Sequence, residues 1–181
     1  AGKTTLSHLV SRFYDPQQGQ ILIDGKDIAK YKQEELHQAM AIVLQEGYLF
    51  SGTIMDNLRF RATNSSEEQI VKLAKQLGTH EAITALSDGY RTWVKEGGGS
   101  LSQGQRQIVS LTRALAADPK DLILDEPTSS MDIYTERVIQ QALDVLIRNR
   151  TTLVIAHRLS TIRKSDCIMV IGNGTILEQG T

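Results

Sequence analysis

The sequence contains little cysteine, no long hydrophobic run and no excess of charge of one sign. Its 181 residues include 1 cysteine, Cys167, which excludes an internal disulfide and favours a reducing compartment. The longest uninterrupted apolar run covers residues 39–44, which is far too short to span a bilayer, so we expect a soluble chain. Its 20 basic residues nearly balance 21 acidic ones, and a chain without a basic excess is not expected to bind nucleic acid.

The first residues, Gly2-Lys3-Thr4-Thr5, match the second half of the pattern G-x-x-x-x-G-K-[ST]. There is no initiator methionine and no signal-peptide pattern, so we expect a fragment that begins inside this motif. In the motif, backbone N–H groups at a helix start face a phosphate, the lysine reaches the β- and γ-phosphate oxygens, and the threonine hydroxyl ligates Mg²⁺. The apolar stripe predicted for this helix comprises Leu6, Leu9, Val10 and Phe13. Taken alone, the short match favours an ordinary capped surface helix.

Two adjacent carboxylates follow a short apolar stretch near the middle of the chain. Residues 121–124 predict a buried strand, and Asp125 and Glu126 come directly after it. Successive side chains on an extended chain point to different sides, so the two acids can take different tasks. Asp125 is suited to hold Mg²⁺ or its water, and Glu126 to polarise an attacking water. The alternative is a solvated acidic loop, which the apolar strand before the acids makes less favoured.

Two further predicted strands also end in a polar residue. Residues 41–44 precede Gln45, and residues 151–156 precede His157. Open α/β sheets place ligand-contacting groups at the carboxyl ends of their strands. Gln45 by itself is better explained as an exposed loop residue, and a lone histidine is more often structural. A third polar residue at such a place favours the functional interpretation for His157.

The start of one predicted helix is suited to an anion. Ser102 and Gln105 have the spacing of a capping box, and Pro119 ends the helix. Capping alone contributes roughly 1 kcal/mol and does not require Gly104 in the first turn. A glycine there allows close approach of the backbone to a phosphate, which favours anion binding.

The remaining pattern predicts one α/β domain with an inserted helical lobe. Turn signals at Asp24-Gly25 and Asn173-Gly174 predict antiparallel hairpins. Helical patterns dominate residues 51–118, whereas residues 1–50 and 119–181 contain the strands. We therefore expect the chain to form a single domain with an α/β core and a helical subdomain at 51–118.

With these motifs in place, the chain resembles the nucleotide-binding domain of an ABC transporter over essentially its whole length. The matching segments are 2–5 (end of Walker A), Gln45 (Q-loop), 101–105 (signature), 122–126 (Walker B), 129–132 (D-loop) and His157 (H-loop). Residues 52–58 and 92–97 are similar to segments of exporter-type cassettes. The resemblance implies a P-loop NTPase (RecA-like) core with an antiparallel β hairpin and an inserted α-helical subdomain. One departure is Gln103, where the family usually has glycine.

The resemblance also implies a role for each motif residue. The residues that would bind ATP are Gly2, Lys3, Thr4, Thr5, Gln45, Ser102, Gln103, Gly104, Gln105, Asp132 and His157. The Mg²⁺ ligands would be Thr4, Gln45 and Asp125. The catalytic residues would be Glu126, His157, Lys3 and Gln45, with Glu126 as the general base.

The expected partners are a second nucleotide-binding domain, paired head to tail as a homodimer or heterodimer, and a transmembrane domain. Each ATP would lie between Walker A of one domain and the signature of the other, at the cytoplasmic face of the cell membrane. The expected activity is ATP hydrolysis that powers export. Two alternatives are a non-transport ABC ATPase, such as a DNA-repair or translation factor, and a nucleotide-gated dimerisation module without turnover.

Overall fold

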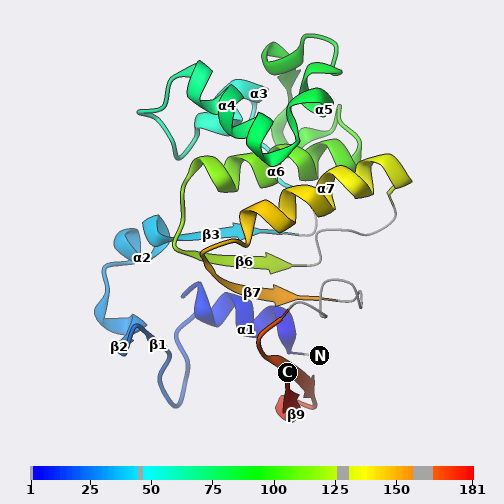
Figure 1. Ribbon diagram of the computed structural model, residues 1–181. Helices are drawn as coiled ribbons and strands as arrows, with labels where there is room; N and C mark the ends of the chain where they lie inside the picture. The colour runs from blue at the N-terminus through cyan, green and yellow to red at the C-terminus, as the bar shows by residue number, and fades with distance from the viewer. Residues whose placement is uncertain (1, 45–46, 126–130, 157–164) are drawn as a thin grey trace.

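The computed structural model describes residues 2–44, 47–125, 131–156 and 165–181 (Figure 1). Its centre is a parallel sheet of β3 (Met40–Val43), β6 (Asp121–Asp125) and β7 (Thr151–Ile155), in the order β3–β6–β7. Each strand is a short run of mostly apolar residues, as expected for strands covered on both faces. Leu122, Ile123 and Leu124 of the central strand are all at most 2% exposed. The predicted strands are therefore confirmed, although β3 begins and ends one residue before the predicted range of 41–44.

Helices cover both faces of this sheet. Figure 1 shows α6 (Gln103–Ala116) and α7 (Ile133–Leu146) on one side of the strands and α1 (Lys3–Val10) on the other. The common side of α6 and α7 follows from right-handed crossovers, because the connections from β3 to β6 and from β6 to β7 step in the same direction across the sheet. The predicted α1 stripe is only partly correct, since α1 ends at Val10 and Phe13 lies beyond it with half of its surface exposed.

The chain between β3 and β6 is mainly helical. It contains α3 (Ile54–Arg59), α4 (Glu67–Leu77), α5 (His80–Thr84), the helical turns η2 (Gly89–Arg91) and η3 (Glu96–Gly98), and finally α6. Thr53 and Ser66 form capping boxes at the starts of α3 and α4, and Gly78 ends α4 in the left-handed conformation. The segment also contains a small antiparallel pair, β4 (Gly52–Thr53) with β5 (Trp93–Val94), which was not predicted.

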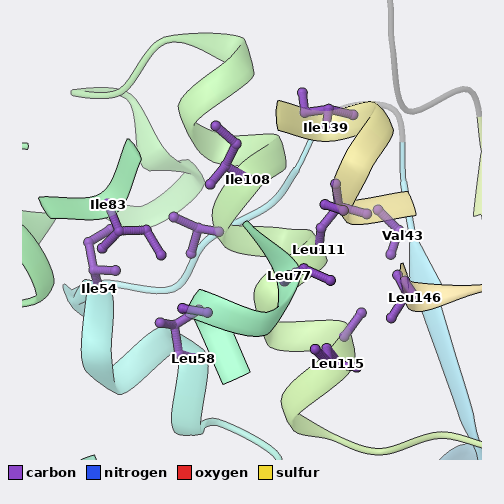
Figure 2. Packing of buried hydrophobic residues seen from close by; sticks show 14 of the residues in the cluster. Val43, Ile54, Leu58, Leu77, Ile83, Ile108, Leu111, Leu115, Ile139 and Leu146 are labelled. Atoms are coloured by element: carbon purple, nitrogen blue, oxygen red, sulfur yellow. The ribbon is translucent and has the colours of Figure 1, made fainter. Parts of the chain in front are cut away.

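The helical segment and the sheet share one hydrophobic core. Figure 2 shows side chains from α3, α4, α5, α6, α7 and β3 that point toward one another. The labelled residues are Val43, Ile54, Leu58, Leu77, Ile83, Ile108, Leu111, Leu115, Ile139 and Leu146. The buried face of α6 supplies three of these side chains, so this helix joins the two parts of the molecule.

Two hairpins flank the sheet, as the turn signals predicted. β1 (Leu22–Ile23) pairs antiparallel with β2 (Lys26–Asp27), followed by η1 (Ile28–Lys30) and α2 (Gln33–Ala39). β8 (Ile168–Gly172) pairs with β9 (Thr175–Gly180). Asp24 and Gly25 have φ angles of 50° and 77°, and Asn173 and Gly174 have φ angles of 52° and 78°. These positive angles at both central residues are those of the favoured two-residue hairpin turn. Within the described residues, no helix is long and apolar enough to cross a membrane.

Candidate functional site

The described site residues gather along one edge of the sheet. Figure 1 shows the starts of α1, α6 and α7 on the same side as the carboxyl ends of β3, β6 and β7. Parallel strands bring their carboxyl ends together, which is where α/β sheets bind ligands. The sheet separates the helix starts at this edge, because α1 begins on one face of the sheet and α6 and α7 begin on the other.

The start of α1 is suited to bind an anion. Gly2 is the N-cap with φ 105° and ψ −15°, a conformation that L side chains rarely adopt, and its carbonyl accepts the N–H of Leu6 at 3.0 Å. The N–H groups of a helix's first turn have no partner within the helix, so they can face a phosphate. Lys3 is half-buried and lines a cleft of about 1090 Å³ that β7 and β8 also border. Thr4 and Thr5 are exposed in this first turn.

The start of α6 has the predicted capping box. The Ser102 Oγ accepts the N–H of Gln105 at 3.2 Å, and the Ser102 N–H donates to Oε1 of Gln105 at 2.8 Å. Gly104 is buried, and a Cβ on it would overlap the methyl group of Thr135 on α7. Close packing of α6 on α7 is therefore a second reason for this glycine, in addition to the anion approach inferred from the sequence.

Asp132 is the N-cap of α7. Its Oδ1 accepts the backbone N–H of Thr135 at 2.9 Å. Hydrogen bonds from the Thr135 side chain and backbone lower the pKa of the Asp132 carboxyl below its usual value. Since Thr135 also covers Gly104, the starts of α6 and α7 form one cluster.

Asp125 is the last residue of β6 and lies beside the ends of both neighbouring strands. It pairs in register with Ile155 of β7, and Leu124 before it pairs with Val43 of β3. The strands β3, β6 and β7, which precede Gln45, Glu126 and His157 in the sequence, are thus hydrogen-bonded neighbours. Gln45, Glu126 and His157 themselves lie outside the described residues. Among the described residues, no group of three His, Cys, Asp or Glu side chains gathers as a metal site.

Sequence reasoning gave no role to Arg113, which has unusual surroundings inside α6. Its Nη2 donates to the carbonyl of Tyr48 at 2.8 Å, and its guanidinium lies 5.6 Å from the centre of the Phe50 ring. Burial lowers the pKa of this guanidinium. Arginine is common in the last turn of helices. The sequence alone therefore gives no sign that Arg113 has a particular role.

Comparison with known proteins agrees with this geometry. The family model described as ABC transporter matches residues 1–129. The chain is 49% identical over 180 residues to an uncharacterized ABC transporter ATP-binding protein, YknV, of Bacillus subtilis, covering 99% of the chain and 30% of YknV. It is 49% identical to the probable multidrug resistance ABC transporter ATP-binding/permease protein YheH of the same organism, over 99% of the chain and 27% of YheH.

A solved structure is similar over the same length. The structure of a bacterial Atm1-family ABC exporter with ATP bound aligns with a TM-score of 0.90 at 42% identity, covering 99% of this chain and 32% of that one. The chain belongs to the ABC transporter family. It is an ATPase domain of the exporter type, as the motifs predicted, and it spans about 30% of the length of these bacterial relatives.

Proposed function

We propose that this chain binds and hydrolyses ATP and so powers export by a larger ABC transporter. The observation that carries the proposal is that the starts of α1, α6 and α7 and the end of β6 lie along one edge of the sheet. These positions bear Lys3, Ser102, Asp132 and Asp125. The whole chain would form one ABC domain, with its α/β core in residues 1–50 and 119–181 and its helical subdomain in residues 51–118. The relatives' names, which include ATP-binding and permease functions in one protein, support the coupling to transport.

The start of α1 would hold the triphosphate. The first-turn N–H groups would bind the phosphate oxygens, and the ammonium of Lys3 would neutralise charge on the β- and γ-phosphates. The oxygen ligands that Mg²⁺ prefers are the hydroxyl of Thr4, the carboxylate of Asp125 and the amide oxygen of Gln45. Mg²⁺ usually takes only one or two carboxylates together with substrate phosphates, so a single acid at the end of β6 fits it. When bound, Mg²⁺ neutralises negative charge on the phosphates.

Glu126 would act as the general base in hydrolysis. Its carboxylate would orient a water for in-line attack on the γ-phosphorus and accept a proton from that water as the new P–O bond forms. The bond between the γ-phosphorus and the bridging oxygen would break, leaving ADP and inorganic phosphate. His157 and Gln45 would contact the γ-phosphate and stabilise the charge in the transition state.

The signature residues would serve the ATP of a second domain. The helices α1 and α6 begin on opposite faces of the sheet. A nucleotide bound at Lys3 would therefore be separated by the sheet from the start of α6 in the same chain. Head-to-tail pairing of two domains, either as a homodimer or a heterodimer, would bring Ser102, Gln103, Gly104 and Gln105 to the partner's γ-phosphate. Asp132 lies in the same cluster as Gly104 and would couple the two sites.

An exposed aromatic surface supports a membrane-spanning partner. The rings of Phe50 and Phe60 stack with centres 4.2 Å apart, although both side chains are at least 40% exposed. They border a groove of about 300 Å³ that Arg61 and Arg113 also line. Exposed apolar surface beside a groove is typical of a protein interface. We assign it to the transmembrane domain, which would hold this chain at the cytoplasmic face of the membrane.

Removing the Lys3 ammonium tests the nucleotide assignment. In the full-length protein we expect Lys3→Ala to abolish ATP binding, measured by titration with a fluorescent ATP analogue, and to abolish phosphate release. Lys72→Ala, which changes an exposed lysine on α4, is the matched control and should leave both unchanged. Undiminished affinity in Lys3→Ala would remove this residue from the phosphate site.

A further inference from the structure

The chain that leads out of β3 into the helical segment lies directly against α6. Gly47 is buried there, and a Cβ on it would come within 2.6 Å of Ser110 Oγ and 2.8 Å of the Arg106 carbonyl oxygen. The φ angle of Gly47 is not among the positive ones. The glycine is therefore needed for space and not for conformation, because the backbone of this segment touches the backbone of the helix.

Arg113 binds Tyr48 and Phe50, which follow Gly47, to the same face of α6. Residues 106, 110 and 113 are spaced by four and three positions, which places them on one side of a helix. The guanidinium of Arg113 donates to the Tyr48 carbonyl at 2.8 Å and lies 5.6 Å from the Phe50 ring centre. The same group therefore binds the segment by a charged hydrogen bond and by a cation–π contact.

Other groups of the helical segment complete this attachment. The N–H of Gly97 donates to the Leu49 carbonyl at 2.8 Å. The amide of Asn57 brackets Phe50, accepting its N–H at 2.8 Å and donating to its carbonyl at 2.9 Å. Residues 47–50 are thus bound along their length, and Arg113 supplies the link to α6 itself.

The same helix carries the signature residues at its other end. A rigid α-helix rises 1.5 Å per residue, so Ser102 at the N-cap and Arg113 are separated by about 16 Å. The segment that Arg113 holds follows Gln45 by two residues in the sequence. We propose that Arg113 is a positioning residue that fixes residues 47–50 on α6 and thereby sets the start of α6, with Ser102, for the partner's ATP. This inference rests on the proposed function of Ser102.

The test uses the full-length transporter and compares Arg113→Met with Gly47→Ala. Both variants should retain the affinity for an ATP analogue at the Lys3 site, because neither side chain lies at α1. Both should lower kcat for ATP hydrolysis by about tenfold or more, since small misplacements of a reacting group have such effects. Arg91→Met, an exposed arginine on η2, is the matched control and should leave kcat unchanged.

A double variant separates positioning from general stabilisation. Gly47→Ala and Arg113→Met disrupt the same attachment, so we expect their effects on kcat to be non-additive, and we expect Arg113→Lys to restore part of the loss. Unchanged kcat in folded Arg113→Met protein, or strictly additive losses, would overturn the proposal. A variant with a lower melting temperature but a normal kcat at temperatures where it is folded would also overturn the proposal.

If the wild-type transporter does not hydrolyse ATP, the proposed function fails. The double-mutant cycle is then measured on the free energy of unfolding. A coupling energy of zero between Gly47→Ala and Arg113→Met would overturn the proposed attachment.

Discussion

Gly104 shows how one residue meets two requirements that the sequence alone does not separate. A glycine in the first turn of a helix costs about 1 kcal/mol relative to alanine, so its presence needs a reason. One reason, under the proposed function, is the approach of a phosphate to the start of α6. The structure adds another, because the Thr135 methyl group occupies the place where a Cβ would lie.

Replacing Gly104 tests the packing reason. We expect Gly104→Ala to destabilise the domain by about 1–3 kcal/mol, because an added methyl in a tight contact forces the helices apart. Without the overlap, alanine would instead stabilise α6 by up to about 1 kcal/mol. Urea unfolding measures the sign. Gly99→Ala, where nothing lies within 4 Å and φ is −58°, is the control, and Gly104→Ala with Thr135→Ser should recover part of the loss.

Asp132 makes the stability of α7 depend on pH. Its folded-state pKa is lowered by hydrogen bonds from Thr135. The contribution of this cap is therefore present above the ordinary aspartate pKa of about 3.9 and is lost as the pH falls below it. We expect Asp132→Asn, which keeps a capping oxygen, to reduce the fall in the free energy of unfolding between neutral pH and acid. An unchanged acid dependence in urea titrations would contradict this.

At the scale of elements, local signals were sufficient where they fix the backbone directly. The capping box of α6 and the paired positive φ angles of both hairpin turns follow from a few adjacent residues. The pairing of β4 with β5 joins segments about 40 residues apart through strands of 2 residues each, too short for any periodic pattern. Sequence reasoning therefore missed it.

The Ser66 cap tests how far such local signals stabilise an element. The Ser66 Oγ accepts the N–H of Gln69 at 3.3 Å, and Gln69 Oε1 accepts the N–H of Ser66 at 2.7 Å. We expect Ser66→Ala to lower the free energy of unfolding by about 1 kcal/mol, the usual value of a lost N-cap. The neighbouring Ser65→Ala should change it by less than about 0.5 kcal/mol. Equal effects of the two changes in chemical denaturation would show that the cap contributes nothing.

At the scale of the molecule, the motif order predicted the family and the fold, and the resemblance implied that each ATP site is shared between two domains. The sequence places Lys3, Ser102 and Asp125 in one chain, whereas the fold puts α1 and α6 on opposite faces of the sheet. Contacts between distant segments, such as Arg113 with Tyr48 or Gly104 with Thr135, have no counterpart in local pattern. The residue roles at Gln45, Glu126 and His157 remain predictions from the motifs.

The central claim is that two such domains hydrolyse ATP between them with Glu126 as the base. The most direct test is Glu126→Gln in the full-length transporter, measured by phosphate release and by the separation of the two ATP-binding domains, for example with spin labels. We expect turnover to fall by at least about 100-fold, as for loss of a general base, while ATP holds the domains together. Glu34→Gln, an exposed acid on α2, should behave as wild type. Unchanged turnover in Glu126→Gln, or domains that stay apart with ATP bound, would contradict the account.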